Sequence, residues 1–93
     1  MHGEYKTVGG KLVIVDFDVA AGHLQNVMVS GDFFLYPDSA LESLSGAIEG
    51  LEVSLGEAEF AQRIRAGFEP GAELVGTSAE GIAIALRRGL DAG

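Results

Sequence analysis

Gly31-Asp32-Phe33-Phe34-Leu35-Tyr36-Pro37 is the stretch at which the chain changes from a strand-like pattern to a helical one. It places three of the seven aromatic rings of the protein beside a Gly-Asp turn. Successive side chains of a strand point to opposite faces, so Phe33 and Phe34 do not easily enter one core together. Two interpretations are open. Either a glycine bulge lets the rings fill the core, or one ring, or Tyr36, is exposed as an interface anchor.

The residues before this stretch predict three antiparallel strands. Residues 11–20 alternate between apolar and polar side chains, which is the period of a half-buried strand. A short strand over residues 4–8 precedes them, joined through the hairpin-type dipeptide Gly9-Gly10. A third strand over residues 24–30 follows a turn in which Gly22 takes a positive φ. The expected buried face carries Val13, Val15, Phe17, Val19, Val27 and Val29, with Asp16 and Asp18 on the wet face.

The residues after the stretch predict helices. Residues 39–42, 54–57 and 77–80 each match the S/T-x-x-E capping pattern, in which a hydroxyl and a glutamate satisfy two amides at a helix start. Gly50 and Gly67 are expected to end the first two helices. The apolar positions at helical spacing are Leu41, Leu44, Ile48 and Leu51, then Phe60, Ile64 and Phe68, and finally Ile82, Leu86 and Leu90.

Two further features complete the prediction. Arg87 and Arg88 suit the negative end of the last helix, and Glu69-Pro70-Gly71 is expected to be a loop. Strands followed by helices indicate one α+β domain over residues 1–93. Its architecture is a three-stranded antiparallel sheet followed by about three helices packed on one face.

The composition limits what the chain can bind. The apolar fraction of 47% is typical of a globular domain. Its 14 acidic and 6 basic residues give a net charge of −8, and the adjacent pair Arg87-Arg88 is a poor match for a nucleic-acid backbone. Without cysteine the sequence excludes disulfides, zinc–thiolate sites and iron–sulfur ligation by thiolates.

The sequence also gives no sign of a membrane segment. No apolar run approaches the ~20 residues that a spanning helix needs. The first residues lack the charged-then-apolar layout of a signal peptide. We therefore expect a cytoplasmic protein that binds neither nucleic acid nor membrane.

No pattern indicates catalysis by this chain alone. Gly9-Gly10-Lys11 lacks the spacing of a phosphate-binding loop and is followed by a strand, so a hairpin turn is expected. Lys11 could still meet a ligand or partner carboxylate. Asp16 and Asp18 could share a cation, but a solvated strand face is the better interpretation. Since His2 and His23 lie on a tail and a turn without a ligand pattern, we expect no catalytic residue and no metal site.

Two motifs give the chain a specific resemblance. Residues 5–13 read Tyr-Lys-Thr-Val-Gly-Gly-Lys-Leu-Val, and residues 29–34 read Val-Ser-Gly-Asp-Phe-Phe. Both resemble the C-terminal accessory domain of lipoate–protein ligases. Residues 74–86 are similar to the last helix of that domain, although this part is generic. The resemblance spans nearly the whole chain, in order.

This resemblance implies a fold and a function. The fold of the family is shared with iron–sulfur scaffold proteins of the IscU and SufE kind, whose cysteine-based function is out of reach here. In the family a large domain holds lipoate and ATP, forms lipoyl-AMP and passes the lipoyl group to a lysine of an acyl carrier domain. The small domain is needed for the adenylation step. A chain that starts at Met1 just before the strands resembles the split form, in which the small part is a separate protein.

The resemblance therefore implies a non-catalytic accessory subunit whose partner is the catalytic subunit of a lipoate–protein ligase, with the lipoyl acceptor domain engaged indirectly. No cofactor is expected on this chain alone, while lipoate, ATP and Mg are implied for the complex. Gly9, Gly10 and Lys11 are expected at the rim of the active site. The expected partner or rim residues are together Gly9, Gly10, Lys11, Gly31, Asp32, Phe33, Phe34 and Tyr36.

The chain departs from the family pattern in two places. Val8 stands where the family often has proline before Gly-Gly, and residues 51–76 resemble the family only loosely. Two other functions are open: a general interaction module that docks on another enzyme or carrier domain through its aromatic patch, and a small-molecule binding protein acting alone. The sequence leaves open whether the partner is a lipoate ligase or a related biotin or octanoate enzyme.

Overall fold

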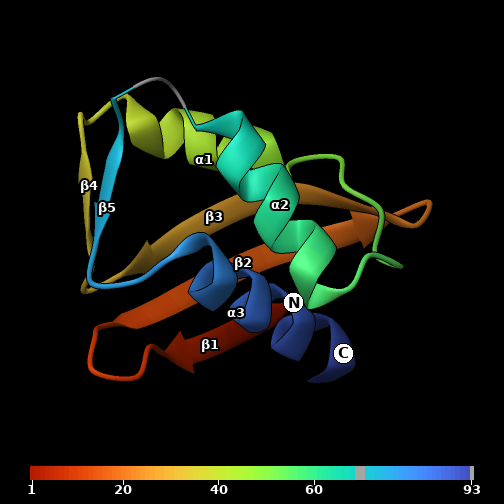
Figure 1. Ribbon diagram of the computed structural model, residues 1–93. Helices are drawn as coiled ribbons and strands as arrows, with labels where there is room; N and C mark the ends of the chain where they lie inside the picture. The colour runs from red at the N-terminus through yellow and green to blue at the C-terminus, as the bar shows by residue number, and fades with distance from the viewer. Residues whose placement is uncertain (69–70, 93) are drawn as a thin grey trace.

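The computed structural model of the chain describes residues 1–68 and 71–92, so Glu69 and Pro70 of the expected loop lie outside the described residues. It confirms the α+β class, with one three-stranded and one two-stranded sheet beside three helices (Figure 1). In chain order the elements are β1 (His2–Lys6), β2 (Leu12–Ala20), β3 (His23–Gly31), β4 (Phe34–Tyr36), α1 (Ala40–Ile48), α2 (Glu57–Gly67), β5 (Glu73–Val75) and α3 (Ala79–Ala92).

The first sheet is the expected antiparallel meander, in the order β1-β2-β3. The β1–β2 pairing sets Lys6 opposite Leu12 and His2 opposite Asp16. Alternation along β2 buries the side chains of Val13, Val15 and Phe17. The tight turn between β2 and β3 uses positive φ at Gly22, as expected, and also at Ala21.

The expected buried face is wrong at one position. Val19 is 36% exposed. The pairing of β2 with β3 contains one extra residue on β3, since Asp16 pairs with Met28 and Asp18 with Gln25, so the alternation of β2 itself is unchanged. Val19 lies at the end of β2, where residues 18–20 are all exposed. The side chain that is buried at this end of the sheet is Leu24, and Val29 is buried farther along β3.

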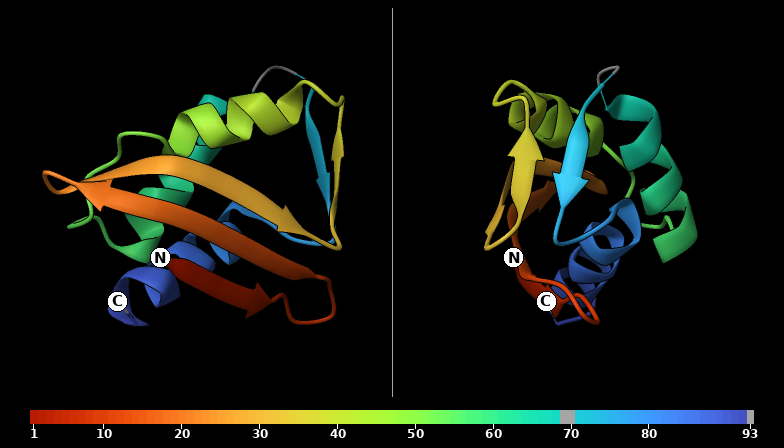
Figure 2. Two further views of the ribbon diagram at one scale, coloured as in Figure 1. Left: turned by 180° about the vertical axis from the view of Figure 1, so that it is seen from behind. Right: turned by 60° about the vertical axis from the view of Figure 1, so that its left-hand side comes forward.

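The second sheet was not predicted. β4 pairs antiparallel with β5, with Phe34 opposite Val75 and Tyr36 opposite Glu73. The two strands stand at one end of the molecule, as the left-hand view of Figure 2 shows. The prediction therefore covers the meander and the helices but not this pair of short strands.

The helices occupy one side of the meander, as expected, but only α3 packs directly on β1 and β2. α2 packs on α3 and α1, while α1 lies against β3 and β4. The left-hand view of Figure 2 shows the opposite face of the meander without a helix in the described part of the chain. Within residues 1–68 and 71–92, no helix has the length and apolar character needed to cross a bilayer.

Glycine contacts set how closely these layers approach. A Cβ on Gly3 would lie 1.9 Å from the carbonyl oxygen of Ala85 and 2.7 Å from the nitrogen of Gly89. A Cβ on Gly67 would lie 2.2 Å from the Cβ of Ala47, where α2 crosses α1. The backbones of β1 and α3, and of α2 and α1, therefore meet at distances that a larger residue does not permit.

None of the three predicted hydroxyl caps is found as predicted. Ser39 precedes α1 as expected, although its side chain forms no cap hydrogen bond. α2 begins at Glu57 with Gly56 as its N-cap, so Ser54 is not a cap. Before α3 the oxygen that accepts from a first-turn amide belongs to Ser78, whose Oγ lies 3.1 Å from the nitrogen of Gly81, and not to Thr77.

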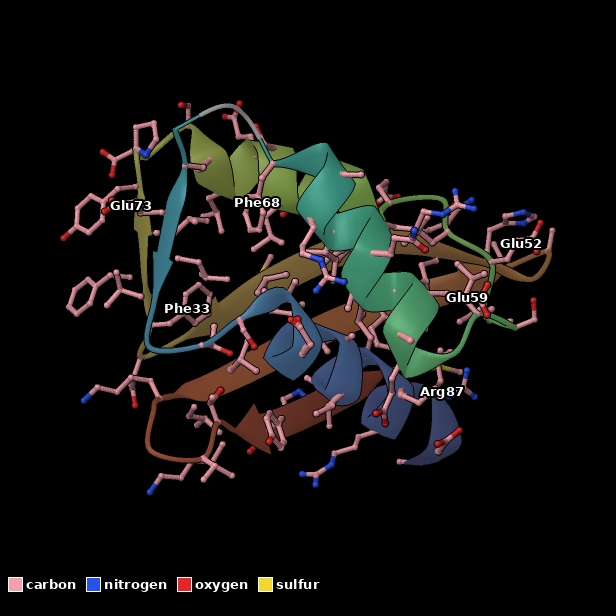
Figure 3. The ribbon with its side chains drawn as sticks, in the orientation of Figure 1. Phe33, Glu52, Glu59, Phe68, Glu73 and Arg87 are labelled. Atoms are coloured by element: carbon pink, nitrogen blue, oxygen red, sulfur yellow. The ribbon has the colours of Figure 1, made fainter. Side chains whose placement is uncertain are left out.

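The two arginines near the end of α3 join it to other segments. Arg87 donates to the carbonyl oxygens of Val53 and Leu55 at 2.9 and 3.1 Å (Figure 3). The guanidinium of Arg88 lies 5.0 Å from the ring centroid of Tyr5 and donates to the carbonyl of Glu4 at 3.3 Å. Both side chains therefore connect the helix to neighbouring loops and strands.

Replacing Gly3 with alanine tests the contact between β1 and α3. We expect Gly3→Ala to lower the free energy of unfolding by about 1–3 kcal/mol, because the added methyl group meets backbone atoms that must move. Gly46→Ala in α1 is the matched control, since a Cβ there has no neighbour within 4 Å. That control should be more stable than the parent by about 0.5–1 kcal/mol. Urea denaturation measures both, and equal stability of the two variants would contradict the role given to Gly3.

Candidate functional site

The turn between β1 and β2 is the first part of the expected site. Gly10 donates its amide to the carbonyl of Thr7 at 2.8 Å, and Thr7 donates to the carbonyl of Lys11 at 3.1 Å. Gly9 has a φ of 70°, in the region that glycine adopts without strain. The expected hairpin turn is confirmed, and it leaves Gly9 and the Lys11 side chain exposed.

The turn meets the second part of the expected site at one corner of the molecule. Asp32 donates its amide to the carbonyl of Leu12 at 3.1 Å. Lys11 donates its amide to the carbonyl of Gly76 at 2.7 Å. A Cβ on Gly76 would lie 2.7 Å from the Cγ of Lys11 and 3.5 Å from the Cα of Phe33. We call this meeting of residues 7–12, 31–34 and 76–77 the corner.

The beginning of α3 is tied to the corner by a side chain as well. The hydroxyl of Thr7 donates to the hydroxyl oxygen of Thr77 at 2.8 Å. Neither Gly76 nor Thr77 was among the expected site residues. Their distance along the chain from the Gly9-Gly10 turn left no local pattern that could place them there. The corner is therefore formed by three segments, of which the sequence identified two.

The orientation of the aromatic rings separates the two interpretations of the central stretch. Phe33 is half-buried and points to the inner side of β4 and β5 (Figure 3). Phe34 and Tyr36 are 58% and 54% exposed. Their rings stack with centroids 6.4 Å apart and planes 15° apart. The structure therefore has Phe33 packed against the core, and Phe34 and Tyr36 on the surface, as the second interpretation requires.

These rings lie on one side of the two-stranded sheet. Phe34, Tyr36 and their cross-strand neighbours Val75 and Glu73 are all exposed, whereas Leu35 and Leu74 on the other side pack against the core. We call Phe34, Tyr36, Glu73 and Val75 the aromatic face. Three of its four side chains are apolar or aromatic, which is the composition typical of the centre of a protein interface.

The charges around the aromatic face are mainly negative. Asp32, Asp38 and Glu73 are exposed near β4 and β5. Lys6 and Lys11 lie beside the Gly9-Gly10 turn, and neither makes an ion pair within the described ranges. The corner thus presents two unpaired cations next to an apolar face with acidic residues at its border. This arrangement can attract both an anion and a basic protein surface.

A hollow lies on the inner side of β4. Its volume is about 430 Å³. The residues around it come from the end of β3, from β4 and the residues on either side of it, and from the start of α1: Val29, Ser30, Gly31, Phe33, Leu35, Asp38 and Leu41. The hollow is lined mainly by apolar side chains, with one carboxylate at Asp38.

The acidic residues of the meander form a different cluster. His2 lies between two carboxylates, with its Nε2 2.6 Å from Glu4 and its Nδ1 2.6 Å from Asp16. These hydrogen bonds, first that to Glu4 and then that to Asp16, raise the pKa of His2 above 6.5. Asp18 instead accepts from the side chain of Asn26 at 2.9 Å. Sequence reasoning missed this cluster because the β1–β2 register, and no local motif, sets His2 opposite Asp16.

The part of the chain that the structure describes has no cluster suited to a metal ion, and the corner has no nucleophile beside a base. No group of three histidine, cysteine, aspartate or glutamate side chains there is arranged to hold a metal ion. The side chains of the corner offer two lysines, hydroxyls and aromatic rings, without a base beside a nucleophile. Their arrangement is suited to contact and charge attraction.

A comparison with solved structures supports the fold. Neither a protein-family model nor a curated protein matches the chain. Among solved structures the chain is similar to one from a study of an archaeal lipoylation system, a bi-partite lipoate protein ligase and its E2 lipoyl domain from Thermoplasma acidophilum. The identity is 22%, the match covers 94% of this chain and 93% of that chain, and the TM-score is 0.72. The expected resemblance is thereby confirmed at the level of the fold.

The aromatic face and the core should respond differently to truncation. We expect Phe33→Ala to lower the free energy of unfolding by about 1.5–3 kcal/mol, because this ring packs against the core. Phe34→Ala and Tyr36→Ala should each change it by less than about 0.5 kcal/mol, because both rings face solvent. Urea denaturation of the three variants measures the difference. A large loss in the Phe34 variant would show that this ring supports the fold itself.

The His2 cluster predicts how stability depends on pH. Because pairing raises the pKa of His2, its contribution to stability is complete below pH 6.5 and is lost as the pH rises through the raised pKa. The side chain is half exposed, so the effect is small. Denaturation at several pH values compares the parent with His2→Gln. The parent should lose stability relative to the variant as the pH rises, and parallel pH profiles would refute this role of His2.

Proposed function

We propose that the chain is the non-catalytic accessory subunit of a two-part lipoate–protein ligase. In this role it docks on a catalytic subunit and is needed when that subunit activates lipoate to lipoyl-AMP with ATP. The observation that supports the proposal is the likeness in fold to a chain from a bi-partite lipoate protein ligase system, over nearly the full length of both chains. The motifs at residues 5–13 and 29–34 support the same assignment.

The aromatic face is the surface that we assign to the catalytic subunit. Exposed aromatic pairs are frequent anchors of protein interfaces, because they bury much apolar area with little loss of side-chain freedom. Phe34 and Tyr36 already stack on each other, so their rings are ordered before the partner arrives. Phe33 precedes them in the chain and packs against the core. Asp32 would meet donors of the partner at the border of the contact.

The corner is the part that we assign to the rim of the active site of the complex. Gly9 and Gly10 keep the turn narrow, and a Cβ on Gly10 would lie 2.4 Å from the carbonyl oxygen of Gly76. Gly31 likewise permits a close backbone contact between its segment and β2, since a Cβ there would lie 2.2 Å from the carbonyl oxygen of Leu12. Lys11 projects from this compact base with an unpaired ammonium group. It would face a phosphate of the nucleotide or a carboxylate of the partner.

Lipoate, ATP and Mg²⁺ belong to the catalytic subunit in this proposal. The described residues of the present chain offer no acidic cluster suited to a cation. Its contribution is to exclude water from the bound substrates and to hold them in the reactive arrangement. We assign the passage of the lipoyl group to a lysine of an acyl carrier domain to the partner as well.

An adenylation assay tests the proposed function. A catalytic subunit that lacks this domain is mixed with lipoate, ATP and Mg²⁺, and lipoyl-AMP is measured with and without the present protein. We expect formation of lipoyl-AMP to depend on the protein.

Phe34→Ala should raise the dissociation constant of the two chains about 30-fold, the effect of an interface residue worth about 2 kcal/mol. The surface control is Glu59→Gln on α2, outside the aromatic face. Leu74 is not part of the aromatic face either, since it lies on the opposite side of the sheet.

Three results would contradict the proposal. One is a catalytic subunit that forms lipoyl-AMP equally well alone, and another is turnover of lipoate and ATP by the present protein without a partner. The third is a pull-down in which a different enzyme or a carrier domain is retained and the ligase subunit is not, which supports a general interaction module. A Lys11→Ala variant that supports adenylation at the parent rate removes Lys11 alone from the mechanism.

A further inference from the structure

One edge of the second sheet is open. β4 is hydrogen-bonded to β5 on one side. Among residues 1–68 and 71–92, no backbone group outside β5 bonds to Phe34, Leu35 or Tyr36. The right-hand view of Figure 2 shows β4 at the outside of the pair, with β5 as its single neighbouring strand. The peptide groups on its outer edge are therefore available to a strand from another chain.

The outer edge of β3, unlike that of β4, is covered by other parts of the chain. The carboxylate of Glu49 accepts from the amides of Asn26 and Val27 at 3.0 and 2.9 Å. Leu24 donates to the carbonyl of Leu51 at 2.9 Å and accepts from Gly50 at 2.7 Å. The chain thus covers the outer edge of β3 over several residues. β4 has no comparable cover in the described part of the chain.

The hollow lies beside this open edge. Phe33 and Leu35 line it, together with residues of β3 and α1, and no residue of β5 does so. It therefore lies on the inner face of the sheet, next to β4 and away from β5. An added strand alongside β4 would direct every second side chain to this side, next to Leu35. The other side chains would lie beside Phe34 and Tyr36 and extend the aromatic face.

The hollow and the aromatic face are suited to different side chains of an added strand. A cavity of about 150 Å³ holds a benzene ring, so about 430 Å³ has room for a long side chain. Leu35 and Leu41 offer apolar contact to its stem, and the carboxylate of Asp38 offers a partner to a cation at its end. Arginine and lysine have this combination. On the opposite side, the aromatic rings are suited to apolar side chains.

We propose that a partner adds an extended segment to the free edge of β4, with basic side chains entering the hollow and apolar side chains joining the aromatic face. A second copy of this chain is a poor occupant, because its net charge of −8 makes two copies repel each other. β4 is short, which limits pairing with unsuitable strands, so the side-chain contacts decide which segment binds. Only the assignment of that segment to the catalytic subunit rests on the proposed function.

A synthetic peptide tests this inference without any ligase subunit. The probe is a short peptide of alternating valine and arginine, and its control is the peptide of alternating valine and glutamate. Amide hydrogen exchange and chemical shifts of the isotope-labelled protein are followed by NMR. We expect the arginine peptide to slow exchange of β4 amides that face away from β5, while the glutamate peptide does not. Binding without slower exchange in β4, or equal binding of both peptides, overturns the proposal.

Charge removal provides the second test. Asp38→Asn should weaken binding of the arginine peptide about tenfold, the effect of losing a hydrogen bond to a charged group. Glu59→Gln removes an exposed first-turn carboxylate of α2 and should leave the affinity unchanged. An Asp38 variant that binds as tightly as the parent overturns the role of the hollow. If lipoyl-AMP forms equally well without the protein while the peptide still binds, the proposed function is refuted and the binding of a strand to β4 is not. Failure of the proposed function and failure of this inference are therefore distinguishable.

Discussion

The close contact between β1 and α3 at Gly3 is the constraint on which the rest of the structure depends. The carbonyl of Ala85 and the backbone of Gly89 occupy the space that a side chain at this position would need. This contact fixes how the last helix lies on the first hairpin, because α3 is the helix that packs directly on β1 and β2. With α3 in this place, Gly76 and Thr77 reach the Gly9-Gly10 turn. The corner is therefore a consequence of small residues in the layer below it.

Periodicity predicts the parts of the fold in which local pattern and burial agree. The alternation of Val13, Val15 and Phe17 identifies β2 correctly, and glycine ends the first helix near Gly50. The pattern fails at Val19, because alternation predicts the face of a side chain but not its burial, and residues 18–20 at the end of β2 are all exposed. The second sheet could not be predicted, since β5 has three residues and pairs with a strand far away in the chain.

The candidate site shows the same division. Strand geometry alone requires Phe33 and Phe34 to diverge, and the structure assigns the first to the core and the second to the surface. The capping motif near residue 77 gave the wrong hydroxyl, because two adjacent residues can both act as caps and only Ser78 has the geometry to accept from Gly81. Thr77 is used differently, as a tie to Thr7. Such long-range ties follow from packing and leave no trace in a short window of sequence.

The hydrogen bond between Thr7 and Thr77 also has a consequence for biosynthesis. It joins residues from the first and last quarters of the chain, so the corner cannot be complete while the ribosome is still translating the region between them. A truncated or half-made polypeptide can contain the motifs at residues 5–13 and 29–34 and still lack the assembled corner. In the complex that we propose, a catalytic subunit that needs the complete corner would therefore select finished, fully folded molecules. A partner that binds only these would in turn protect them from unfolding and proteolysis.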